Sequence, residues 1–174
     1  MKKILFIIIS VIVGILVYNK NDEIIIPSDA IRVRIIANSN NINDLYQKQK
    51  LKDEIKDDLY NIISNSNSSN EASDLIASNL DNIKRIVNSK TKDAIINYGI
   101  NYFPKKVYKG VIYPEGEYNS LTITLGSGLG DNWWCVLYPP LCMINDNKTV
   151  GDVEYRLLVT DMLSHWQNFT FMIT

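Results

Sequence analysis

The sequence predicts an α+β protein in which a short apolar signal or anchor helix precedes a single domain of element order β-α-α-β-β-β-β, closed by a further helix. The chain has 174 residues, of which 46% are hydrophobic and 21% charged, and this composition suits one domain with an ordinary core. Segments with alternating apolar residues stand before and after segments with helical spacing. We therefore expect a mixed sheet packed on two helices.

The amino end, residues 1–20, is expected to be a signal peptide or a signal anchor. Lys2 and Lys3 precede an almost uninterrupted apolar stretch, as in export signals. This stretch is shorter than the about 20 residues of a membrane-spanning helix, and no small-residue cleavage site follows it, so cleavage stays open. If uncut, the segment would hold the protein at a membrane. Residues 21–30 would then be a tether, and 31–174 the exported domain.

The charge of the chain argues against several classes of partner. Lys and Arg number 18 against 19 Asp and Glu, and the exported part loses three lysines with the signal segment and becomes more acidic. Nucleic acid and anionic lipid select basic surfaces, so the sequence offers no electrostatic reason to bind either one. Nothing in it indicates a cofactor or a small-molecule substrate.

The first strand and the two helices follow from their spacing. Residues 31–37 alternate, with Arg32 and Arg34 on the face opposite the apolar side chains, and turn formers follow at 38–41. Apolar residues at helical spacing predict a helix over 42–63. Ser68 and Glu71 have the spacing of a capping box, which predicts that a second helix begins there and continues to about residue 90.

Period-two alternation returns for the rest of the domain. Strands are expected over 96–102, 107–113 and 121–125, and the turn at 114–117 indicates that the last two form a hairpin. The apolar run 133–138 suits an interior strand covered on both faces. Finally, residues 152–166 have the spacing of a closing helix.

The loop Gly126-Ser127-Gly128-Leu129-Gly130 resembles a phosphate cradle only superficially. Phosphate loops open a helix and often carry a lysine, whereas this loop ends in Asp131 and leads into a strand. Its glycines are expected to supply turn geometry with positive φ.

Cys135 and Cys142 are separated by a diproline in a chain with an export signal. A disulfide across this bend would add about 2–3 kcal/mol of stability, and two buried free thiols are the equal alternative. A metal site is less favoured, because zinc needs four ligands and only His165 could join the cysteines before carboxylates. A thiol hydrolase or acyltransferase would pair Cys135 or Cys142 with His165, but no third orienting group or hydrolase motif stands out.

The block from Phe103 to Cys142 carries a more specific signal, above all the run Asn-Trp-Trp-Cys-Val-Leu-Tyr-Pro-Pro-Leu-Cys at 132–142. Together with Ile-Arg-Val-Arg-Ile-Ile-Ala-Asn-Ser at 31–39, it resembles the stage II sporulation protein R family of endospore-forming Firmicutes over essentially the whole exported region. The resemblance implies a protein without catalysis of its own, exported from the forespore into the space between the two sporulation membranes. The implied partner is a membrane-embedded aspartic protease, the stage II sporulation GA protein, which processes pro-sigma-E.

The residues expected to contact that receptor are Asp131, Asn132 and Trp133 at the loop tip, with Arg32 and Arg34 as weaker candidates. Trp and Arg are enriched at the energetic centres of protein interfaces. The alternative is structural: the tryptophans would pack in the core and the arginines would be ordinary strand-surface charges.

Overall fold

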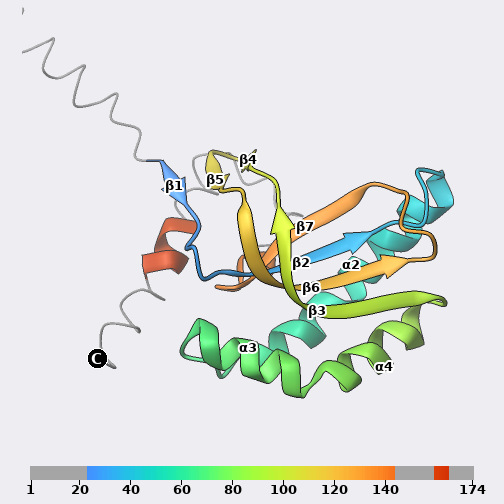
Figure 1. The fold of residues 1–174 in the computed structure, drawn as a ribbon, viewed down its shortest axis with the longest axis horizontal. Helices are drawn as coiled ribbons and strands as arrows, with labels where there is room; N and C mark the ends of the chain where they lie inside the picture. Colours follow the sequence, from blue (N-terminus) through green and yellow to red (C-terminus); the bar gives the residue numbers. More distant parts are fainter. Residues whose placement is uncertain (1–22, 144–158, 165–174) are drawn as a thin grey trace, which may run out of the picture.

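The computed structural model describes residues 23–143 and 159–164 (Figure 1). The expected signal segment, His165 and most of the expected closing helix lie outside the described residues. Within these ranges, no helix is both long enough and apolar enough to cross a bilayer. The elements in chain order are β1 (Ile24–Ile25), β2 (Ile31–Ile36), α2 (Ile42–Ile63), α3 (Ser69–Ser78), α4 (Leu80–Lys90), β3 (Ala94–Phe103), β4 (Lys106–Tyr108), β5 (Val111–Tyr113), β6 (Gly116–Leu125), β7 (Asn132–Tyr138) and η1 (Leu141–Met143), and residues 159–164 are helical.

The predicted α+β class with a mixed sheet is confirmed, but the strands form two sheets instead of one. The larger sheet has the order β3-β6-β2-β7, in which β2 is parallel to β6 and the other pairs are antiparallel. The smaller sheet has the order β1-β5-β4. Figure 1 shows α2, α3 and α4 along one side of the larger sheet.

The first two helices begin where the apolar spacing and the capping box predict, and the structure adds a cap at Asn41. The Asn41 side-chain oxygen accepts the Asn43 N–H (3.1 Å), and α2 spans Ile42–Ile63 as expected. The Ser68 hydroxyl accepts the Glu71 N–H (3.1 Å), while the Glu71 carboxylate accepts the Asn67 N–H (2.8 Å). These bonds satisfy amides that a helix start leaves without partners inside the helix.

The predicted second helix is divided in two at Asn79. The backbone of Asn79 leaves helical geometry, and its side-chain amide donates to the Leu75 carbonyl (2.8 Å) at the end of α3. Its own carbonyl accepts the Ile83 N–H (2.9 Å) in the first turn of α4. An asparagine side chain that competes for backbone groups in this way ends one helix and starts the next.

Two expectations about strand neighbours are wrong. The segment 107–113 does not pair with 121–125, because β4 and β5 form their own hairpin and β6 pairs with β3. Strand β7 is an edge strand, although its second half is buried on both faces as expected. Ahead of β2, Ile24–Ile25 form β1, which pairs with β5, and Ile26 and Ala30 are buried.

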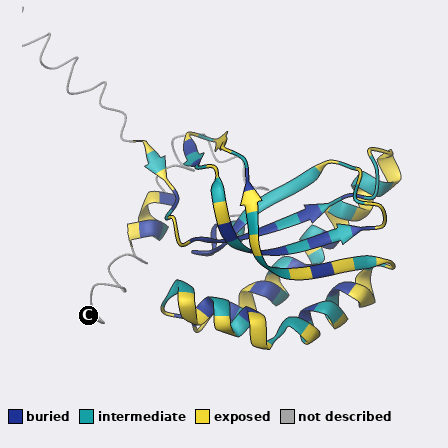
Figure 2. Cartoon of the chain, in the orientation of Figure 1, coloured by how far each residue is buried: buried dark blue, intermediate teal, exposed yellow. Residues whose placement is uncertain are grey.

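Two hydrophobic cores lie on opposite sides of β2. Val33 and Ile35 face the first core, which fills the space between the larger sheet and the three helices. The second core joins the larger sheet to the smaller one and to the helical segment 159–164, through side chains such as Phe103 and Tyr118. Figure 2 shows buried residues along β2 and β6, the two strands in the middle of the larger sheet.

Arg32 lies inside the second core and is only 1% exposed. Its guanidinium carbon is 4.2 Å from the centre of the Phe103 ring, 5.0 Å from Tyr118 and 5.8 Å from Tyr113. Its Nε and Nη1 atoms have no hydrogen-bond partner among the described residues. Burial lowers the pKa of Arg32, and the two tyrosines act in the opposite direction. The alternation of β2 is therefore confirmed, but Arg32 faces a core where solvent was expected.

Arg32→Ala should destabilise the protein by about 2–4 kcal/mol, because it leaves a cavity beneath three aromatic rings. Arg32→Met fills most of that volume without a buried charge and should change the free energy of unfolding by less than about 1 kcal/mol. Urea unfolding of both variants measures the difference. If Met destabilises as much as Ala, the charge over the rings holds this core and our expectation is contradicted.

Candidate partner-binding surface

The glycine-rich loop between β6 and β7, residues 126–131, is held against the turn that follows β2. The Gly130 N–H donates to the Ala37 carbonyl (2.9 Å). The Asn38 side-chain oxygen accepts the Ser127 N–H (2.8 Å), and the Ser127 hydroxyl donates to the Asn38 backbone carbonyl (2.8 Å). With both its backbone and its side chains bonded to this turn, the loop has a defined conformation.

The glycines of the loop are needed for its geometry, as predicted. Gly126 and Gly128 have φ values of 52° and 67°, in the left-handed region that glycine adopts readily. A Cβ atom at Gly130 would collide with the backbone carbonyl of Ser39. The loop can therefore lie this close to the turn only without side chains at these positions.

Asp131 combines a fixed backbone with a free side chain. Its carbonyl accepts bonds from the Ala37 N–H (3.3 Å) and the Lys48 ammonium (2.8 Å), and its N–H donates to the Asn40 side chain (2.7 Å). Its carboxylate is exposed and has no ion pair or hydrogen bond with any residue of the described ranges. A carboxylate that is positioned but unpaired is available to a cationic or hydrogen-bonding partner.

Arg34 lies beside the start of β7, where it joins the loop end to the second core. Its Nε donates to the Asn132 side-chain oxygen (3.3 Å), and its guanidinium carbon is 4.5 Å from the centre of the Trp134 ring. The Trp134 ring in turn packs edge-on against Phe103, with ring centres 5.0 Å apart. Partial burial lowers the pKa of Arg34 from its ordinary high value.

Trp133 points to the other side of the sheet. It is half-buried and packs against the first core, with the Lys52 ammonium 5.8 Å from its ring centre. Consecutive residues of a strand face opposite sides, so Trp133 cannot share a face with Asn132 and Trp134.

The structure thus brings together only some of the five residues predicted to bind the receptor. Asp131 and Asn132 are adjacent at the loop end, and Arg34 contacts Asn132. Trp133 contributes a half-buried surface on the opposite face, and Arg32 has almost no exposed surface. Trp134 joins the cluster through Arg34, a contact that only the antiparallel pairing of β2 with β7 reveals.

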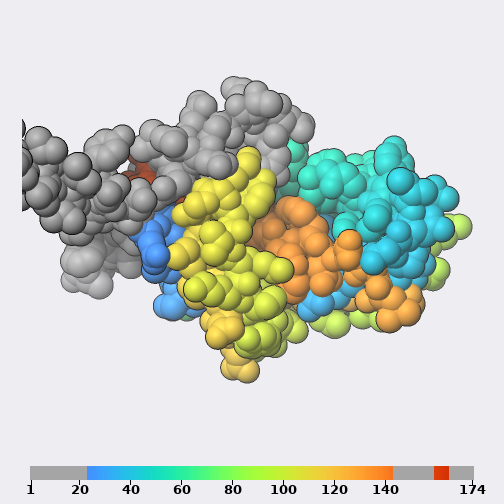
Figure 3. Space-filling view, turned by 90° about the horizontal axis from the view of Figure 1, so that it is seen from above, coloured from blue at the N-terminus to red at the C-terminus, as the bar shows by residue number. Residues whose placement is uncertain are grey.

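Exposed apolar side chains near the loop were not anticipated. Leu129 at the loop tip is 81% exposed, and Ile42 and Tyr46 are exposed one turn apart in the first turns of α2. The loop and the start of α2 lie at the same end of the molecule, since the Leu129 N–H donates to the Asn38 carbonyl (3.0 Å). Figure 3 shows the orange segment that contains β7 at the surface beside the cyan residues of α2. Large exposed apolar residues at one end of a domain are typical of contact surfaces.

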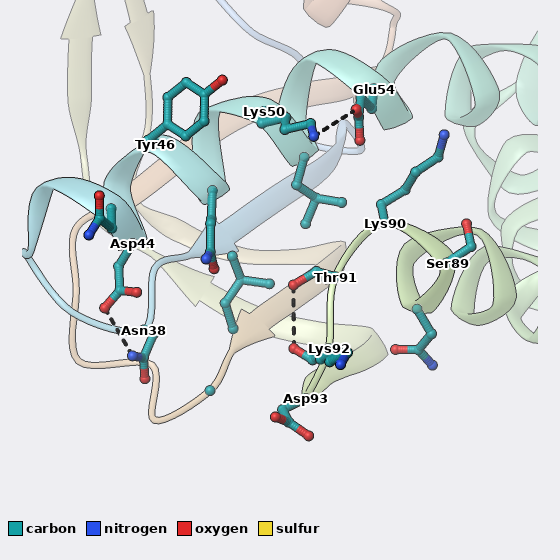
Figure 4. Close-up of a pocket in the computed structure, with 16 residues that line it drawn as sticks. Asn38, Asp44, Tyr46, Lys50, Glu54, Ser89, Lys90, Thr91, Lys92 and Asp93 are labelled. Atoms are coloured by element: carbon teal, nitrogen blue, oxygen red, sulfur yellow. Dashed lines mark hydrogen bonds and ion pairs between the residues drawn. The ribbon is translucent and has the colours of Figure 1, made fainter.

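A polar groove of about 910 Å³ lies beside the loop, between the first half of α2 and the end of α4 (Figure 4). Asp44 stands at its end and accepts bonds from the side chains of Asn38 (2.9 Å) and Ser39 (2.6 Å). Lys50 and Glu54 form an ion pair (3.8 Å) along its wall. Its charges are mixed, and within residues 23–143 and 159–164 no three His, Cys, Asp or Glu side chains gather as a metal site requires.

Cys135 of β7 and Cys142 of η1 form a disulfide, with Cα atoms 5.7 Å apart. Of the two arrangements that the sequence leaves open, the structure contains the bonded one. A disulfide sulfur is no thiolate nucleophile while the bond is intact. His165 lies outside the described residues, so its distance from these sulfurs is not defined.

The described residues form an α+β domain that presents a rigid loop with an unpaired carboxylate, and comparison with known proteins assigns its family. The family model described as stage II sporulation protein R (spore_II_R) matches residues 27–148. The stage II sporulation protein R of Bacillus subtilis (strain 168) is 38% identical over 133 residues, which cover 73% of this chain and 59% of that relative.

The chain therefore belongs to the stage II sporulation protein R family, as the resemblance indicated. The match includes β2, the loop and β7, so the whole candidate surface lies in the shared region. The chain spans 59% of the length of its Bacillus subtilis relative. No solved structure matches it.

Gly130→Ala should destabilise the domain by about 1–3 kcal/mol, because the added Cβ meets the Ser39 carbonyl and forces the loop from the turn. Leu129→Ala is the matched control: this side chain of the same loop is 81% exposed, and its loss should leave the stability of the domain unchanged within about 0.5 kcal/mol. Thermal unfolding by circular dichroism compares the two. Equal effects would show that the loop is not held as described.

Proposed function

We propose that this protein is an exported sporulation signal that activates a membrane-embedded aspartic protease, the stage II sporulation GA protein, which then processes pro-sigma-E. Family membership supports the sporulation role. The binding role is proposed from the geometry of Asp131 at the end of the loop. Three hydrogen bonds hold its backbone, and its carboxylate is exposed to solvent.

The rigidity of this loop supports a ligand's role. Binding costs free energy when flexible segments must become ordered, and a loop already bonded to its own domain avoids much of that cost. The neighbouring Arg34, Asn132 and exposed Leu129 add a cation, an amide and an apolar side chain within the same region. In this proposal Asp131 and Asn132 make polar contacts with the receptor while Leu129 supplies buried apolar area.

Activation requires more than contact. A ligand shifts the equilibrium between an inactive and an active receptor only if it binds the active form more tightly. The proposed surface would therefore have to meet a receptor shape that exists in the active arrangement of the protease. Arg32 takes no direct part in this contact, because its side chain is enclosed by aromatic rings.

Export is the second part of the proposal. Residues 1–20 begin with Lys2 and Lys3 ahead of an apolar stretch, which supports passage across the forespore membrane into the space between the two sporulation membranes. The receptor would meet the domain there, whether the segment is cut or remains as an anchor.

Co-expression with the cognate receptor protease and pro-sigma-E in a non-sporulating host tests the whole proposal. Immunoblots should show processing only when this protein is present, and loss of processing when residues 1–20 are removed. A folded and exported protein that produces no processing would contradict direct activation.

Asp131→Asn should reduce pro-sigma-E processing in that assay at least tenfold, because a charge-assisted contact contributes about 1.5–3 kcal/mol. The substitution keeps the size of the side chain, and Asp131 has no side-chain bond to lose within the described part of the chain. Asp57→Asn, at an exposed position of α2, removes the same charge and should leave processing unchanged. Equal processing by both variants would remove Asp131 from the contact.

A further inference from the structure

Strand β3 forms one edge of the larger sheet and lacks the features that usually protect such an edge. It is ten residues long, Ala94–Phe103, and contains neither a charged residue nor a proline. Natural proteins usually protect exposed edges with lysines, prolines, bulges or very short strands, because unpaired backbone groups invite pairing with another chain. The pairing of β3 with β6 is regular over its whole length, so no bulge disturbs the free edge.

The sequence of β3 is complementary to itself about Gly99. If two copies pair antiparallel with the two-fold axis at this residue, every cross-strand pair joins compatible side chains. Aromatic residues meet β-branched ones and asparagine meets asparagine, and such pairs stabilise antiparallel sheets. The side-chain pairs are Tyr98 with Ile100, Asn97 with Asn101 and Ile96 with Tyr102, while Phe103, which lies opposite Ile95, is buried in the second core of its own copy.

No contact within residues 23–143 and 159–164 explains why position 99 is a glycine. Its backbone is outside the left-handed region, and a Cβ atom added there would have no other atom within 4 Å. A glycine inside a strand weakens it and commonly marks the close approach of another backbone. The proposed axis passes through this residue.

The burial of β3 changes along its length: the first half of one face is covered and the second half is exposed. Ile96, Tyr98, Ile100 and Tyr102 share one face of the strand. Ile96 is only 6% exposed and the Tyr98 hydroxyl bonds to Ser73 of α3 (2.9 Å), so the helices cover the first half of this face. Ile100 and Tyr102 are 62% and 59% exposed, in the half that turns away from the helices (Figures 1 and 2).

In the antiparallel pair, the exposed half of one copy lies beside the covered half of the other. Ile100 and Tyr102 would then contact Tyr98 and Ile96 of the second copy, next to its α3 and α4. One pairing thus gives hydrogen-bond partners to the unpaired backbone groups of the β3 edge. It also covers the exposed apolar side chains of both copies.

We propose that two copies of this chain associate through β3, antiparallel and with the two-fold axis at Gly99, into a continuous eight-stranded sheet. The nine paired residues of each strand form roughly eight to ten backbone hydrogen bonds. The interface is isologous, as in most homodimers. It is independent of the proposed receptor contact, because that surface lies at the loop between β6 and β7.

Charge at position 99 tests the register, because only a residue on the axis faces its own copy. Gly99→Lys and Gly99→Glu each place two like charges opposite one another and should each raise the dimer dissociation constant at least about fivefold. An equal mixture of the two variants pairs lysine with glutamate and should dimerise more tightly than either variant alone. Sedimentation velocity of the full chain in a mild non-ionic detergent measures all three samples.

Val107→Lys is the matched control, since it adds the same charge at an exposed position of β4, outside the proposed pairing. It should leave the dimer unchanged, and circular dichroism should show the native fold for every variant. A wild-type chain that remains monomeric overturns the proposal and leaves the edge to a strand of another protein. Dimers that persist in both single variants, or a mixture that does not recover, overturn it as well.

Discussion

The enclosure of the Arg32 side chain between the two sheets is the packing constraint on which much of this structure depends. The side chain projects from β2, which lies between β6 and β7 in the larger sheet, into a space enclosed by Phe103, Tyr113 and Tyr118. A cation removed from water is costly unless its surroundings compensate, and here the described compensation comes from ring faces. These rings belong to β3, β5 and β6, so the space that the Arg32 side chain fills exists only when both sheets keep this arrangement.

This second core explains why β3 and β6 are long and change direction. Their first contacts, near Ile96 and Ile123, lie over the helices, while Phe103 and Tyr118 at the other end enclose Arg32. Both strands therefore extend beyond the helical layer. The extension leaves the second half of β3 as an exposed apolar edge, and the same geometry that encloses the arginine creates the surface available for association.

The opposite end of the larger sheet presents a polar, hydrogen-bonded loop instead of an apolar strand edge. There the loop 126–131 is bonded to the turn after β2, and Asp131 is held by its backbone while its carboxylate stays exposed. Arg34 links this end to the aromatic cluster through Trp134, which packs on Phe103. The two ends are therefore connected by packed side chains, and the family match covers both of them.

The sequence by itself determined most of the local elements and the family, although it missed the break at Asn79 and the hairpin of β4 and β5. Helical spacing and capping residues placed α2 at Ile42–Ile63 and the next helix start at Ser68, because these signals act within one or two turns. The rare residues of 132–142 indicated the family.

Only the tertiary structure decided which strands are neighbours, that β7 is an edge and that Arg32 is enclosed. Alternation shows which residues share a face of a strand, but what covers that face depends on segments distant in the chain. For the same reason, the sequence placed Asp131, Asn132 and Trp133 on one loop but could not show that Trp133 faces the other side.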